Sequence, residues 1–202
     1  VNVFTMTGSL VADNIAQVGA GFYLANASHV NASRFVGNQA MSGGGLAMEY
    51  GTLRVVNSLF ARNSAEIGSV MIVGVSNDVQ LIHSTIASPT LAAGSALEVF
   101  SGTLSITNSI IASATVGISN TEAIVTEAGN VFFGNKANVS GTVASGGPSL
   151  SGDPAFVNAE ADDYRLTEAS AAIDAGVDSD VTTDVDGELR PQRLGFDAGY
   201  DE

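Results

Sequence analysis

The sequence predicts an all-β fold: a right-handed, single-stranded parallel β-helix with about 25 residues and three strands in each coil, followed by an irregular acidic C-terminal cap. Three observations lead to this prediction. They are a repeat of about 25 residues, three short apolar runs within each repeat, and like residues at the same place in successive copies. The repeat is easiest to follow at one serine, which recurs 24 to 26 residues apart as Ser9, Ser33, Ser58, Ser84 and Ser109.

Each apolar run has the length of a strand. In the third copy the runs are Leu53–Val56, Leu59–Ala61 and Val70–Val73, and polar residues or glycines separate them. Runs this short suit strands and not helices. Like residues can share one place in every copy only if the copies stack in register, so each coil is expected to lie about 4.8 Å above the last.

In-register stacking predicts one interior ladder and two corner columns. The ladder of large apolar side chains consists of Val11, Phe35, Phe60, Ile86 and Ile111. Glycines recur at one corner, where a positive φ or closely spaced backbones exclude a side chain, as Gly19, Gly43, Gly68 and Gly94. Amides expected to bond up the stack are Asn14, Asn38 and Asn63, and Pro89 should end this column.

The same patterns divide the chain into three segments. Residues 1–139 are expected to form the coils, although the period becomes irregular after Val116. Residues 140–152 are rich in Gly and Ser and are expected to form a loop. Residues 153–202 carry most of the acidic side chains and no repeat, so we expect them to cap the open end of the solenoid.

The composition excludes several kinds of partner. The formal net charge is −14, Lys136 is the only lysine, and there is no cysteine. Such a charge repels phosphate backbones, so nucleic acid is not an expected partner. No apolar run approaches the ~20 residues of a membrane helix, so membrane insertion is not expected. The lack of cysteine excludes disulfides and thiolate metal sites.

Two motifs of the coils resemble the repeats of polymorphic outer-membrane proteins, which carry a Phe-x-x-Asn element and a Gly-Gly-small-apolar element. Phe35-Val36-Gly37-Asn38 precedes Gly43-Gly44-Gly45-Leu46, and Phe60-Ala61-Arg62-Asn63 repeats the first element. The whole chain resembles the bacterial surface proteins called choice-of-anchor Q domain proteins, which are right-handed parallel β-helices.

The acidic tail carries the more specific part of this resemblance. Its elements, in the order and spacing of that family, are Asp153-Pro154, Tyr164-Arg165-Leu166, Ala172-Ile173-Asp174-Ala175-Gly176, Asp184-Val185-Asp186-Gly187, Arg190-Pro191 and Asp197-Ala198-Gly199. Ala171, where proline is usual, and Tyr200, where a small residue is common, depart from the pattern. The resemblance implies a secreted or cell-surface location in bacteria. It implies no single activity, because the same fold carries adhesins, lyases and glycosidases.

A β-helix enzyme that cleaves polysaccharides needs carboxylates and bases that converge from neighbouring coils. The candidate set for such a cleft, or for glycan binding, is His83, Arg54 and Glu98. His83 stands where neighbouring copies have Asn57 and Asn108, so it is either a base flanked by amides or one of several polar residues that a corner accepts. The arginines of the coils, expected to be isolated on the surface, are Arg34, Arg54 and Arg62.

The acidic tail contains one string typical of a cation site. Oxygen-bearing side chains alternate ahead of Gly187, and the carboxylates among them are Asp178, Asp180, Asp184 and Asp186. Such alternation suits a structural Ca²⁺, although the spacing is not that of an EF-hand. The alternative is that these carboxylates pair with the arginines of the tail, Arg165, Arg190 and Arg193.

The favoured functional interpretation is a non-enzymatic β-helical module of a secreted or cell-surface protein, adhesin-like or a scaffold. No catalytic residue is assigned, because the charged residues of the coils occupy different places in the repeat. The expected partners are a cell-surface glycan or a protein of a host or neighbouring cell. The alternative is a polysaccharide lyase or glycoside hydrolase, or its inactive carbohydrate-binding remnant.

Overall fold

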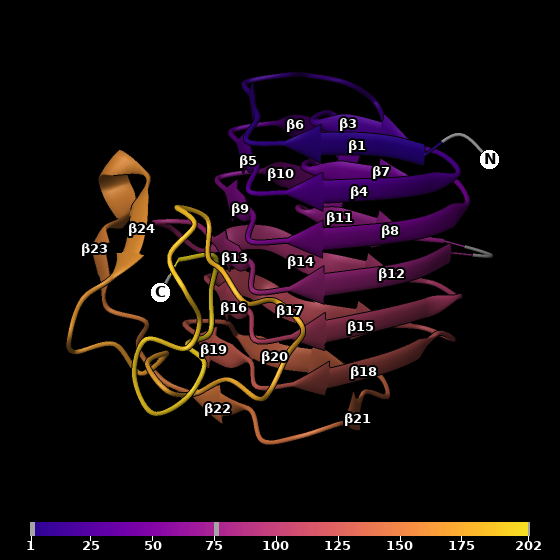
Figure 1. The fold of residues 1–202 in the computed structure, drawn as a ribbon. Helices are drawn as coiled ribbons and strands as arrows, with labels where there is room; N and C mark the ends of the chain where they lie inside the picture. Colours follow the sequence, from indigo (N-terminus) through magenta and orange to yellow (C-terminus); the bar gives the residue numbers. More distant parts are fainter. Residues whose placement is uncertain (1–2, 75–76, 202) are drawn as a thin grey trace.

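The computed structural model describes residues 3–74 and 77–201 and confirms the predicted fold class. The chain winds as a right-handed parallel β-helix, with successive coils stacked from the N-terminal end at the top of Figure 1 to the last coil at the bottom. Three parallel sheets form its sides, which we call the front, side and rear sheets. The described residues include no helix long and apolar enough to cross a membrane.

The strands of each sheet come one from each coil, and we number the coils from the N-terminus. The front sheet consists of β1 (Val3–Thr7), β4 (Ala27–Asn31), β8 (Gly51–Val56), β12 (Asn77–Ile82), β15 (Thr103–Thr107), β18 (Ile124–Ala128) and β21 (Ala144–Ser145). The side sheet consists of β2 (Leu10–Ala12), β5 (Arg34–Val36), β9 (Leu59–Ala61), β13 (Thr85–Ala87), β16 (Ile110–Ala112), β19 (Val131–Phe133) and β22 (Leu150–Ser151). The rear sheet consists of β3 (Phe22–Leu24), β7 (Leu46–Met48), β11 (Met71–Val73), β14 (Ala92–Val99), β17 (Ala114–Asn120) and β20 (Ala137–Ser140).

The expected interior ladder runs through the side sheet. The register pairs Val11 with Phe35, Phe35 with Phe60, Phe60 with Ile86, and Ile86 with Ile111. The rings of Phe35 and Phe60 stack with centroids 4.9 Å apart, and both side chains are fully buried. Because neighbouring coils place like side chains on one another, each coil completes the burial of the one before it.

The expected amide column is also present and joins the first three coils. Asn14 Nδ2 donates to Asn38 Oδ1 over 2.9 Å, and Asn38 Nδ2 donates to Asn63 Oδ1 over 3.0 Å. A serine column runs beside it at the preceding corner, where the backbone N–H of one serine donates to the hydroxyl of the serine in the next coil, from Ser9 to Ser109. These bonds satisfy backbone groups that the corners leave out of the sheets.

A short two-stranded ledge separates the side and rear sheets in the second and third coils. It consists of β6 (Gln39–Ser42) and β10 (Ser64–Ile67), and it precedes the glycine corner. From Phe60 to its rear-sheet successor Met71 the chain takes 11 residues, whereas from Ile111 to Ile118 it takes seven. The period becomes irregular after Val116 because the fifth coil lacks the ledge residues.

Two expectations about the C-terminal part are wrong. Residues 140–152 are not only a loop, because β21 pairs with β18 and β22 pairs with β19, which begins a seventh coil. The acidic tail packs on the β-helix as expected, but along its side and not over its open end. Residues 153–201, which we call the strap, run back along the outside of the side sheet, at the left of Figure 1.

The strap carries little regular structure. Its elements are β23 (Phe156–Asn158), the 3-10 helix η1 (Ala159–Ala161) and β24 (Asp163–Leu166), with the two strands antiparallel. Ala172, Ala198 and Tyr200 of the strap pack with Leu59 and Ile110 in one buried apolar cluster on the outer face of the side sheet. The side sheet is therefore apolar on both faces, because the strap covers its outer one.

Candidate functional site

His83 lies beneath the strap and not in a cleft. Its side chain is fully buried at the corner between β12 and β13, and Nε2 lies 2.9 Å from Ser179 Oγ and 3.1 Å from Asn108 Nδ2. Burial, together with the charge of Arg190, lowers the pKa of His83 to about 3. The imidazole is therefore neutral, and its place in the structure is the attachment of the strap.

The amides above and below His83 hold the strap as well. Asn57 Nδ2 donates to the carbonyl of Thr183 over 2.8 Å. The Asn108 side chain pairs with both backbone groups of Val177, accepting its N–H over 2.8 Å and donating to its carbonyl over 2.7 Å. Attachment of the strap explains why the third to fifth coils carry polar side chains at this corner, whereas the first two coils do not.

The other two members of the candidate set lie on different sheets. Arg54, in the front sheet, forms a two-oxygen ion pair with Asp180 of the strap at 2.8 and 2.9 Å and also donates to Gln80. Glu98, in the rear sheet, accepts hydrogen bonds from Ser95 and Ser119. The expectation that a cleft brings His83, Arg54 and Glu98 together is wrong, because the body of the solenoid separates the two sheets.

The expectation of isolated arginines is wrong for two of the three. Arg54 pairs with Asp180, and Arg62 forms a two-pronged pair with Asp162, which holds the pKa of Arg62 above its usual range. Both partners belong to the strap. Arg34 makes only a long contact, 3.5 Å, with the carbonyl of Asp162.

Among the described residues, the carboxylates of the acidic string are not gathered as the expected calcium ligands would be. Asp180 is engaged by Arg54, and Asp184 Oδ1 accepts the backbone N–H groups of Asp186 and Glu188. Within residues 3–74 and 77–201, no three His, Asp or Glu side chains gather as metal ligands would. Asp178, Asp180, Asp184 and Asp186 therefore do not converge.

Two of the tail arginines expected as partners of that string bond within the strap. Arg165 pairs with Asp163, and Arg190 donates to the carbonyls of Asp197 and Gly199. The motifs of the tail thus build the internal bonding of the strap.

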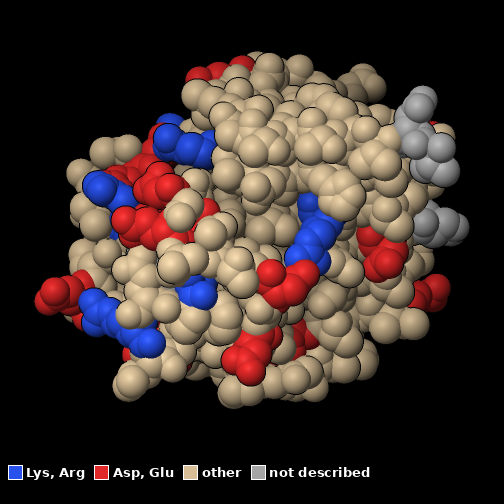
Figure 2. All heavy atoms as spheres, viewed as in Figure 1, with Lys and Arg blue, Asp and Glu red and all other residues tan. Residues whose placement is uncertain are grey.

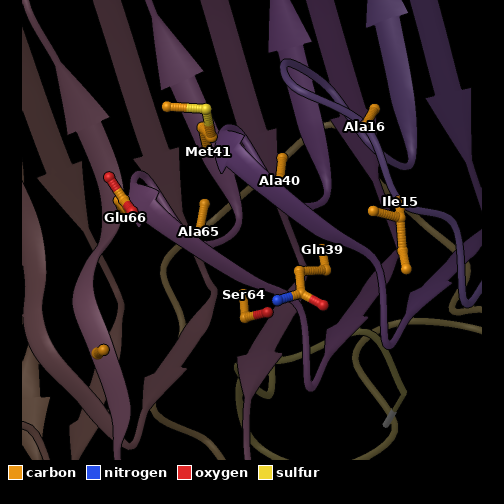
Figure 3. A pocket seen from close by; sticks show the side chains of 9 residues that line it. Ile15, Ala16, Gln39, Ala40, Met41, Ser64, Ala65 and Glu66 are labelled. Atoms are coloured by element: carbon orange, nitrogen blue, oxygen red, sulfur yellow. The ribbon is translucent and has the colours of Figure 1, made fainter.

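An open groove of about 430 Å³ lies over the ledge and is the candidate binding surface (Figure 3). It extends from Ile15 in the first coil to Ala93 in the fourth, so it crosses four coils at a spacing of about 4.8 Å each. Ala40 and Ala65 pair in register on β6 and β10, and such small side chains leave the space between the larger ones open. Figure 3 shows Met41 and Glu66 at one end and Ile15 at the other.

The groove mixes apolar and hydrogen-bonding side chains. Ile15 and Met41 are exposed by 81% and 57%, so they offer apolar surface to a ligand in the groove. Gln39 and Ser64 face each other across the paired strands, and Glu66 is the one acidic side chain of the lining. On the face that Figure 2 draws, most charge gathers over the strap and the lower coils, and the upper coils of that face carry little.

Sequence reasoning missed the groove. Ala16, Ala40 and Ala65 recur two residues after each member of the asparagine column, which was a signal of a second column at the same corner. A column of alanines can be either buried or exposed, so this pattern could not be recognised as a groove without the structure.

No protein-family model, curated protein or solved structure matches the chain.

Proposed function

We propose that the chain is a non-enzymatic β-helical module of a secreted or cell-surface bacterial protein, and that the ledge groove binds an extended glycan. The groove carries the proposal. It crosses four coils, and it offers apolar side chains from Ile15 and Met41 beside hydrogen-bonding groups from Gln39, Ser64 and Glu66. Sugar rings present apolar C–H faces and hydroxyl groups in alternation, so they suit a surface of this mixed kind.

The charged groups that line the groove favour binding without cleavage. Cleavage of a glycosidic bond by acid and base requires two carboxyl groups within about 5–10 Å, and the groove lining supplies only Glu66. The surface location is supported by the resemblance of the tail to that of bacterial surface proteins. His83 and Arg54, which a catalytic cleft would have needed, attach the strap instead.

A glycan array probed with the purified chain tests the proposal. Ala40→Tyr would fill the groove, and it should weaken binding to any glycan recognised by the wild type at least tenfold. Thr52→Tyr, at an exposed position of the front sheet, is the matched control and should leave binding unchanged. Binding by Ala40→Tyr equal to that of the wild type would place the site elsewhere. Release of oligosaccharides from any bound polymer would contradict the non-enzymatic part.

A further inference from the structure

The strap is held to one corner of the solenoid by a short series of hydrogen bonds. Val177 bonds to the side chain of Asn108, Ser179 contacts His83, and the N–H of Gly199 donates to the carbonyl of Asn108 over 2.9 Å. The N–H of Tyr200 then donates to Thr85 Oγ1 over 3.2 Å. Residues 177–200 thus contact the fourth and fifth coils at His83 and at the residues beside it.

His83 is the one ionisable side chain of this corner column. Its neighbours in the stack are Asn57 and Asn108, and the first two coils have Gly8 and Ala32 there. Asn108 Nδ2 can only donate, so His83 Nε2 is the acceptor of that contact and must be unprotonated. A protonated ring would turn an N–H toward the Nδ2 of Asn108, the same nitrogen that donates to the carbonyl of Val177 in the strap, and would lose the contact with Asn108. Ser179 Oγ can accept from the protonated ring, so the strap is disturbed through Asn108.

The charged groups around the imidazole come from the strap. Arg190, itself buried, lies close enough to disfavour a second positive charge, while Asp180 and the backbone of Asp197 act in the opposite direction. The Asp180 carboxylate is already engaged by Arg54, and the Asp197 carboxylate accepts the N–H of Asp174 over 2.7 Å. Burial raises the pKa of Asp197, so this carboxyl gains a proton more readily than an exposed one as the pH falls.

We propose that this corner is a pH-sensitive latch, in which protonation of His83 releases residues 177–200 from the solenoid and uncovers the apolar outer face of the side sheet. The uncovered side chains would include Leu59, Ile110 and Val131, all fully buried under the strap. The latch adds a conformational response to the module and does not depend on the glycan groove.

The direction of the pH dependence follows from the two states. The docked imidazole has a pKa of about 3, and in the released strap it returns to its ordinary 6.5. The released state therefore binds the extra proton between these values. Docking is unaffected above pH 6.5 and weakens about tenfold for each pH unit below it, which amounts to about 100-fold at pH 4.5.

Hydrogen–deuterium exchange of the full chain tests the latch, with peptides from 177–200 compared between wild type and His83→Asn at pH 7.5 and pH 4.5. Asparagine is accepted at this corner in the coils on either side, so the variant keeps the column. At each pH the two proteins share the same chemical exchange rate, so the opening of 177–200 in the wild type can be divided by that in His83→Asn. We expect this ratio to rise about 100-fold between pH 7.5 and pH 4.5. Peptides from 46–60 should stay protected in both proteins.

Several outcomes would overturn the latch. One is an unchanged ratio across pH, and another is loss of protection in 46–60 together with the strap, which would mean global unfolding. An Asp197→Asn variant should keep the pH dependence, and its loss there would assign the effect to Asp197. If His83→Asn fails to fold, the imidazole signals of the two wild-type histidines decide, because a His83 that titrates while the strap amides stay protected contradicts the proposal.

Discussion

At the scale of single residues, the positions at the corner between the front and side sheets share a positive φ, and several of their side chains attach the strap. The six positions have φ between 43° and 64°, and they are Gly8, Ala32, Asn57, His83, Asn108 and Gly129. Glycine tolerates this conformation best, and asparagine and histidine adopt it more readily than alanine does. Polar side chains stand at this corner in the third, fourth and fifth coils, where they contact residues 177–183 of the strap.

The glycine corner gives a stability prediction. Gly43 has φ +65°, and a Cβ there would lie 2.5 Å from the carbonyl oxygen of Leu46. Gly43→Ala should therefore lower the free energy of unfolding by at least about 3 kcal/mol, because the clash adds to the cost of the left-handed conformation. Gly8→Ala is the control, since Gly8 has φ +57° with open space around it, and it should cost about 1–2 kcal/mol. Equal losses in urea denaturation would show that the corner is not packed as described.

Two buried tyrosines of the strap predict a response to alkaline pH. Burial, with nearby Asp162 and Asp201 respectively, raises the pKa of Tyr164 and Tyr200 to about 12. Their phenols are neutral in the fold and ionise near 10 when the chain unfolds, so stability is constant below pH 10 and falls above it. Ultraviolet titration should show two of the four tyrosines ionising only near pH 12. Ionisation of all four near pH 10, with the strap still protected from exchange, would contradict this burial.

At the scale of elements, each column of like residues lets one coil bury the apolar groups, or bond to the polar groups, of the next coil. The interior of the solenoid contains stacked aliphatic and aromatic side chains, while the corners contain hydrogen-bonded serines and asparagines. Both kinds of column repeat with the coil, because a residue that suits one corner suits the same corner one coil away.

The asparagine column gives a prediction with an internal control. Asn38 is fully buried and bonds to Asn14, Asn63 and the carbonyl of Val11, so Asn38→Ala leaves several buried polar groups unpaired. We expect a loss of about 2–3 kcal/mol in the free energy of unfolding. Asn14, at the exposed end of the same column, should cost less than about 1 kcal/mol when replaced by alanine. A thermal or urea denaturation series that gives the same loss at both positions would argue against a continuous column.

The coils could be predicted from the sequence because their information repeats. The alignment of Phe35 with Phe60 needs only the period, and so does the column from Asn14 to Asn63. The shortened fifth coil could not be located, since a four-residue deletion moves every later position out of phase without showing which corner it removes. The register of the rear sheet locates it between Ile111 and Ile118.

The role of His83 was hidden for a different reason. A histidine between two asparagines is compatible with catalysis and with attachment, and only the position of a segment 96 residues away decides between them. The ion pairs of Arg54 and Arg62 span 126 and 100 residues, distances over which sequence spacing contains no information on contact. The groove was missed because exposure of alanines depends on which corner the ledge occupies.

At the scale of the whole molecule, the strap makes the solenoid asymmetric. One flank is covered by residues 153–201, whereas the ledge groove on the next corner stays open. The strap is attached by the apolar contacts of Ala172, Ala198 and Tyr200 with the side sheet and by the hydrogen bonds at the His83 corner. Exposed ion pairs such as that of Arg54 add about 0–1 kcal/mol each. The strap therefore covers the side of the solenoid and does not cap its ends.

The position of the strap is the claim on which the assignments of His83, Arg54 and Arg62 depend, and distances between spin labels test it most directly. The chain has no cysteine, so one label can be attached at Glu160, next to the contact of Asp162 with Arg62, and the second at either Leu10 or Leu150. Leu10 and Leu150 are exposed and belong to one column of the side sheet, in the first and seventh coils. A laterally docked strap predicts that Glu160 lies nearer to Leu10 than to Leu150, with a difference of about 10 Å or more from the coil spacing. The reverse order, with Glu160 nearer to Leu150, would mean that the acidic segment caps the end of the solenoid and would contradict the account.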